Sequence, residues 1–160
     1  MAPLVGRQFV HGVLDFWSLV RDYYARELGI ALEDAFRPDG WWNDGQSDLY
    51  TAGLEQRGGI VLPEHAELQT GDVILMQIRS TNGVPNHAAV YLGDTHILHH
   101  LYGRLSSRDV YGGYWRQATR FVARHARLST PFDPREPTPR DFQSDRTIFD
   151  RKQVYFCSFS

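Results

Sequence analysis

Four of the seven histidines in this 160-residue chain lie within one short stretch, at positions 87, 96, 99 and 100. They fall on two segments, 87–92 and 95–101, whose β-branched and apolar residues are typical of strands. Leu92-Gly93-Asp94 between them is a natural turn, so we expect a hairpin. A three-residue loop centred on Gly93 places His87 directly opposite His99, whereas a two-residue Gly93-Asp94 loop places His87 opposite His100.

Such a pair of histidines is suited to acid–base chemistry. Directly opposed residues have Cβ atoms about 4.5–5.5 Å apart, so one imidazole can orient the other and leave its free nitrogen as a base. This is the base and orienting half of a nucleophilic triad. Alternatively, the histidines merely line a half-exposed strand, or they bind a metal together with Asp94. No HExxH or similar ligand spacing supports a metal site, so we expect no cofactor.

The elements that must position these histidines can also be predicted. Apolar residues recur at helical spacing at Phe16, Leu19, Val20 and Tyr23. They predict a helix from about Asp15 to Leu28, with Asp15 as N-cap and Gly29 as the C-terminal stop. Residues 31–59 favour short helices and loops, and 72–77 and 118–124 favour two further strands. A helix followed by antiparallel strands predicts an α+β fold, with the N-terminal helix packed on the sheet.

Composition argues against several classes of protein, among them nucleic-acid binders and membrane-spanning proteins. With 17 basic and 19 acidic residues and a net charge of −2, the chain has no basic footprint for nucleic acid. It has no apolar run of about 18 residues that would span a membrane. Its single cysteine, Cys157, excludes an intramolecular disulfide. We predict a domain over residues 1–125 and a proline- and charge-rich arm over 126–160, ending in a β-prone segment at 154–160.

Five segments together resemble a known family. They are FVHGVLDFWSLVR at 9–21, WW at 41–42, GDV at 71–73, NHAAVYLGD at 86–94 and ILHH at 97–100. In this order they are similar to the NlpC/P60 cysteine-peptidase domain, in the version found in bacteriophage tail assembly proteins. The resemblance implies a papain-like fold that hydrolyses peptidoglycan stem peptides. It also implies that His87 is the general base and His99 its orienting residue, which favours the three-residue loop.

The chain departs from this family at one decisive position. The family places its nucleophilic cysteine directly after the residue that caps the first helix, and here that position holds Phe16. A helix N-terminus stabilises a thiolate, but phenylalanine offers no nucleophile. Ser18 lies about 200° around the helix and points elsewhere. Cys157 could reach the site only if the arm folded back over it, so we expect no covalent catalysis.

Three functions remain open. The first is a phage tail assembly or tail-tip protein whose peptidase domain is inactive, with other tail proteins as partners. The second is an active peptidoglycan endopeptidase whose cysteine has been replaced in this sequence. The third is a module that binds stem peptides without cleaving them. The first two imply a location in the virion tail, or in the host cytoplasm during tail assembly.

Overall fold

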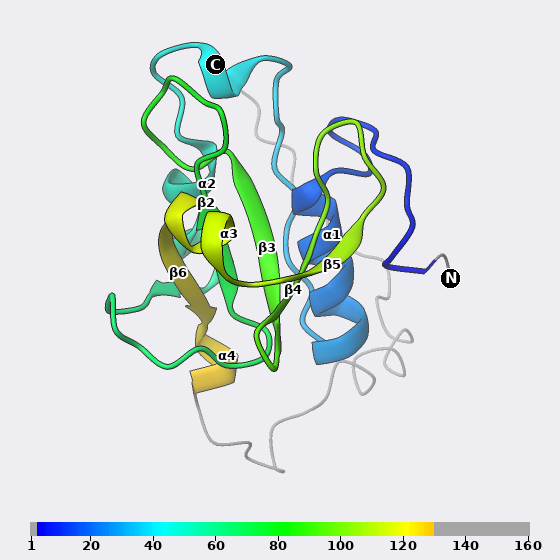
Figure 1. The fold of residues 1–160 in the computed structure, drawn as a ribbon, viewed down its shortest axis with the longest axis vertical. Coiled ribbons are helices and arrows are strands. Elements are labelled where there is room, and N and C mark those ends of the chain that lie inside the picture. The colour runs from blue at the N-terminus through cyan, green and yellow to red at the C-terminus, as the bar shows by residue number, and fades with distance from the viewer. Residues whose placement is uncertain (1–2, 130–160) are drawn as a thin grey trace, which may run out of the picture.

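A six-stranded antiparallel sheet forms the centre of the protein, in a computed structural model that describes residues 3–129 (Figure 1). The strand order across the sheet is β1-β6-β2-β3-β4-β5. The strands are β1 (Gly59–Val61), β2 (Val73–Met76), β3 (His87–Gly93), β4 (His96–His99), β5 (Ser107–Val110) and β6 (Thr119–His125). The α+β fold expected from the sequence is confirmed.

The first helix forms where its apolar spacing and caps predict it. Helix α1 (Phe16–Tyr23) begins after Asp15, whose carboxylate accepts a hydrogen bond from the backbone N–H of Ser18. The Ser18 hydroxyl in turn accepts one from the backbone N–H of Asp15, which completes a capping box. The final turn widens into a π-helix, η1 (Tyr24–Leu28), and Gly29 ends it at a φ of +66°.

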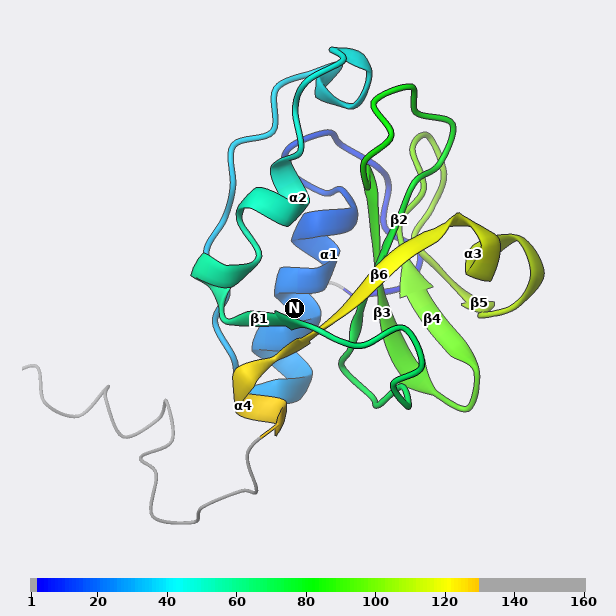
Figure 2. The same ribbon diagram turned by 90° about the vertical axis from the view of Figure 1, so that its left-hand side faces the viewer.

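The sheet is buried on both faces because its central strands are apolar at nearly every position. Figure 2 shows α1 on one side of the sheet and the short helix α3 (Gly113–Ala118) on the other. On the first face, Val73, Leu75, Val90 and Leu98 pack with Leu19 and Val20 of α1. On the second, Ile74, Met76, Ala89 and Ile97 pack with Tyr111 and Ala118. This two-sided packing holds the hairpin rigidly between two layers.

Four predicted strands are confirmed as β2, β3, β4 and β6, whereas β1 and β5 were not predicted. Strand β1 has only three residues, and β5 alternates partly buried with exposed positions and lacks an apolar run. Both are edge strands, which need less core-facing surface than central ones.

Short elements occupy the rest of the described chain. The predicted short helices of the middle segment are η2 (Trp41–Asn43), α2 (Leu49–Ala52) and η3 (Glu55–Arg57). Helix α4 (Ala126–Ser129) follows β6 directly, and its Leu128 packs against the core. None of the helices within residues 3–129 has the length and apolar character needed to cross a membrane. The predicted arm beyond residue 129, its terminal strand and Cys157 lie outside the described residues.

Candidate functional site

Position 16 lies at the first turn of α1, and the capping residue before it is firmly fixed. Asp15 is fully buried, and its carboxylate accepts hydrogen bonds from Arg37 Nε at 2.7 Å and the Gly12 N–H at 3.0 Å. Burial alone would raise the pKa of Asp15. The hydrogen bonds from Ser18 and Arg37 and the positive charge of Arg37 outweigh burial, so the net pKa lies below its usual value.

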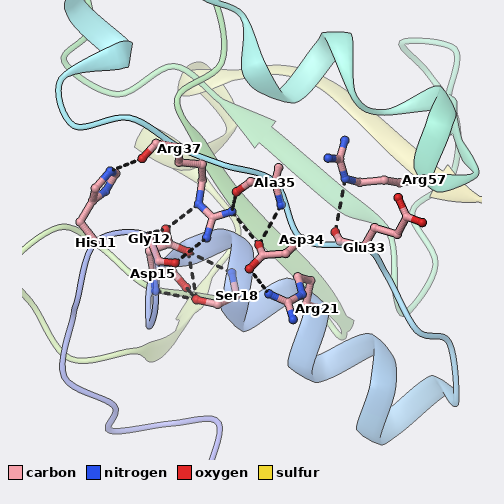
Figure 3. A network of polar contacts seen from close by, with 10 residues as sticks. All are labelled: His11, Gly12, Asp15, Ser18, Arg21, Glu33, Asp34, Ala35, Arg37 and Arg57. Atoms are coloured by element: carbon pink, nitrogen blue, oxygen red, sulfur yellow. Dashed lines mark hydrogen bonds and ion pairs between the residues drawn. The ribbon is translucent and has the colours of Figure 1, made fainter.

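Arg37 ties this helix terminus to the long segment that follows η1, as Figure 3 shows. Its guanidinium also donates to Asp34 at 2.9 Å and to the Gly12 carbonyl at 3.3 Å. The Arg37 side chain is 1% exposed, so the Arg37–Asp15 pair is a buried ion pair. It therefore fixes the N-terminal turn of α1, which carries Phe16. No periodic pattern in residues 31–59 distinguishes Arg37, so its role was not predicted from the sequence.

Phe16 fills the space beside the histidines. Its side chain is buried, and its ring meets the rings of Tyr50 and His87 edge-on, at centroid distances of 5.6 and 5.3 Å. The ring centroid of Phe9 also lies 6.3 Å from that of Phe16. Ser18 cannot replace a nucleophile here, because its hydroxyl is hydrogen-bonded within the capping box. The side chain at position 16, which packs against His87, is therefore a hydrocarbon ring.

His87 and His99 do meet, but not as a directly opposed pair. His87 Nε2 lies 3.3 Å from His99 Nδ1. In the β3–β4 ladder, however, His99 is opposite Ala89, so the two histidines are diagonal neighbours on one face. Both predicted loops are therefore wrong. The actual turn is Asp94-Thr95, with φ values of +47° and +60°, as a type I′ turn requires, and the ladder is bulged between Tyr91 and Gly93.

A third residue, Asp109, extends this contact. Its carboxylate oxygen Oδ2 lies 2.9 Å from His99 Nε2, and it reaches His99 diagonally across the β4–β5 ladder. The ring of Trp115 packs edge-on against His99 at 4.6 Å. Asp109 was not predicted from the sequence, because it lies on the edge strand β5. Once β5 is paired with β4, Asp109 is the residue diagonal to His99 and can be identified from the register.

The environment of the two histidines favours neutral rings. Burial lowers the pKa of His87 well below its usual value, and the neighbouring charges of His99 and His100 lower it further. Burial also lowers the pKa of His99, although the hydrogen bond and charge of Asp109 offset part of that effect. A neutral His87 can accept a proton, which is the state that a general base requires.

The remaining histidines of the hairpin do not join this group. His100 is buried, but its Nε2 lies 3.1 Å from the Arg104 carbonyl oxygen, and Phe9 packs edge-on against its ring. His96 is exposed and contacts the Asp94 carbonyl oxygen. The loop that would have paired His87 with His100 is absent. Within residues 3–129, no three His, Cys, Asp or Glu side chains are grouped so that they could hold a metal ion.

Two of the quoted motifs act as supports for the site. Asn86 uses its side-chain amide to bridge the backbone N–H and carbonyl of Ile78, and this fixes the start of β3 directly before His87. Asp72 is fully buried, and Arg124 binds both of its carboxylate oxygens, at 2.8 and 2.9 Å. The GDV and NHAAVY segments thus fix β2 and β3 in place.

A family model described as NlpC/P60 matches residues 6–124. The chain belongs to the NlpC/P60 family. The chain is 44% identical over 122 residues to "Tail tip assembly protein K" of Escherichia phage lambda, covering 76% of this chain and 59% of that protein. It is 37% identical over 130 residues to the protein of the same name from Escherichia phage N15, covering 77% of this chain and 49% of that protein. The chain therefore spans about half to three fifths of the length of these two relatives.

Proposed function

We propose that this chain is a phage tail assembly protein whose NlpC/P60 domain does not hydrolyse peptide bonds. The observation that carries the proposal is Phe16, which stands edge-on to His87 at 5.3 Å where the family resemblance places a nucleophile. The names of the lambda and N15 relatives supply the tail assembly role. Other tail proteins are the expected partners, and the virion tail or the assembling tail is the expected location.

Catalysis fails here for a simple chemical reason. Acyl transfer through the enzyme needs a side chain with a lone pair, activated by an adjacent base. The base is present, because His87 is neutral and is held by His99. The hydrocarbon ring of Phe16 can form no acyl-enzyme, and Ser18 is occupied by its contacts with Asp15. The site therefore contains a positioned base with nothing to activate.

Hydrolysis of a peptidoglycan stem peptide tests this proposal. The chain should release no product, as followed by mass spectrometry, and Phe16→Cys supplies a thiol beside His87. A matched control is Phe16→Ser in the same chain. Serine is about the size of cysteine, but its hydroxyl is a much weaker nucleophile than a thiol. Product released by the unmodified chain above the background of His87→Ala would overturn the proposal.

The alternative is an active endopeptidase for which position 16 is cysteine, replaced by phenylalanine in this sequence. The observation in its favour is the intact set of contacts from Asp109 through His99 to His87. If this alternative holds, folded Phe16→Cys turns over stem peptides with a rate that His87→Ala abolishes. A folded Phe16→Cys that never releases product would remove it and leave the assembly role.

The assembly role has its own test. Limited proteolysis of the chain, alone and mixed with other tail proteins, should show protection of the predicted arm beyond residue 129 only in the mixture. Equal cleavage in both samples would count against the predicted arm as the partner-binding segment.

A further inference from the structure

Three polar side chains form a continuous line across three adjacent strands. Asp109 on β5 contacts His99 on β4 at 2.9 Å, and His99 contacts His87 on β3 at 3.3 Å. His99 is fully buried and His87 is 3% exposed, whereas the Asp109 side chain is 40% exposed. The line therefore runs from the surface at the edge of the sheet to the buried base.

The chemistry of the first contact decides where the protons lie. An ionised carboxylate only accepts hydrogen bonds, so the His99 nitrogen that faces Asp109 must carry the proton. A neutral His99 with its proton on Nε2 has a lone pair on Nδ1. That lone pair faces His87 Nε2, which must therefore donate. A neutral His87 with its proton on Nε2 then carries its own lone pair on Nδ1.

The reverse arrangement is unfavourable at the same distances. If His99 carried its proton on Nδ1, its Nε2 lone pair would face the Asp109 carboxylate at 2.9 Å, with two acceptors and no proton between them. His99 Nε2 is buried, so leaving it without a donor carries a desolvation cost that water cannot relieve. Trp115, packed edge-on at 4.6 Å, restricts rotation of the His99 ring as an escape from this conflict.

We propose that Asp109 is a positioning residue that sets the tautomers of His99 and His87, so that the basic lone pair of His87 lies on Nδ1. This nitrogen is the one that His99 does not use, so it is the nitrogen of His87 that can accept a proton. Only the meaning of these tautomers for proton transfer rests on the proposed function, in which His87 is a base. The tautomers themselves exist without any nucleophile at position 16.

Nitrogen-15 NMR of the histidine rings in the full chain tests the proposal without turnover. At about pH 7.5, above the usual histidine pKa, both His87 and His99 should show protonated Nε2 and unprotonated Nδ1. In Asp109→Leu, which offers no acceptor, the ring nitrogens of both histidines should shift toward a mixture of the two tautomers. Asp94→Asn, in the turn of the same hairpin, is the matched control and should leave both rings unchanged.

The possible outcomes separate cleanly. Protonated Nδ1 on His99 or His87 in the unmodified chain overturns the proposal before any variant is made. Unchanged rings in folded Asp109→Leu overturn it as well. If that variant does not fold, Asp109→Ala also removes the acceptor with a smaller side chain, and its rings must lose the single-tautomer pattern. Because no step measures hydrolysis, these results are independent of whether Phe16→Cys is active.

Discussion

The buried pair between Asp15 and Arg37 allows a quantitative prediction for Asp15→Asn. The variant keeps the size of the side chain, and asparagine is as good an N-cap as aspartate. It removes the negative charge opposite Arg37. The amide must then direct either its NH₂ group or its one uncharged oxygen toward two donors, Arg37 Nε and the Gly12 N–H. Breaking a buried ion pair on one side costs about 3–5 kcal/mol. Asp34 still contacts Arg37, so we expect the lower end, about 3 kcal/mol.

Urea unfolding followed by tryptophan fluorescence measures this loss, since Trp17 and Trp41 are both buried. Asp34→Asn is the matched control, because it removes the other carboxylate on Arg37. That carboxylate is 51% exposed, so its loss should cost no more than about 1 kcal/mol. If Asp15→Asn costs no more than Asp34→Asn, the buried pair is not what anchors the start of α1.

Three further predictions concern stability. Phe16→Ala should cost about 3–5 kcal/mol in urea unfolding, as for a buried aromatic ring; a cost below about 1 kcal/mol would mean that position 16 is an open cleft. Burial lowers the pKa of His87, so the unfolded chain binds more protons below about pH 6.5. Stability should therefore fall as the pH drops from about 7.5 to 5.5, and by the same amount in the exposed control His96→Gln. Arg124→Met leaves Asp72 buried without its partner and should cost about 3 kcal/mol; an unchanged urea midpoint would contradict that assignment.

The sequence predicted best what depends on neighbouring residues. Helix α1, its cap Asp15 and its stop Gly29 follow from local spacing and backbone preferences, and all three are present. The central strands follow from their apolar residues for the same reason. Edge strand β5 has no such pattern, so Asp109 could not be placed near His99 before the sheet was built.

The hairpin register shows why the histidine contact was predicted for the wrong reason. Gly93 is the obvious turn residue, yet it pairs with His96, and Asp94-Thr95 make the turn with positive φ angles. A β-branched threonine rarely adopts such a φ, so local preference points away from the true turn. The actual pairing differs by two residues from the three-residue loop. An even shift keeps each side chain on its face, so His87 and His99 still meet, along a diagonal.

The most direct test of the central claim, that Phe16 occupies a nucleophile position beside a positioned base, is the thiol pKa of a cysteine placed there. Phe16→Cys is made together with Cys157→Ser, so that one thiol remains, and the rate of alkylation is followed against pH. The helix N-terminus and His87 should lower this pKa clearly below the free value of about 8.5, and adding His87→Ala should return it toward that value. A thiol at position 16 that titrates at about 8.5, whether or not His87 is present, would contradict the account.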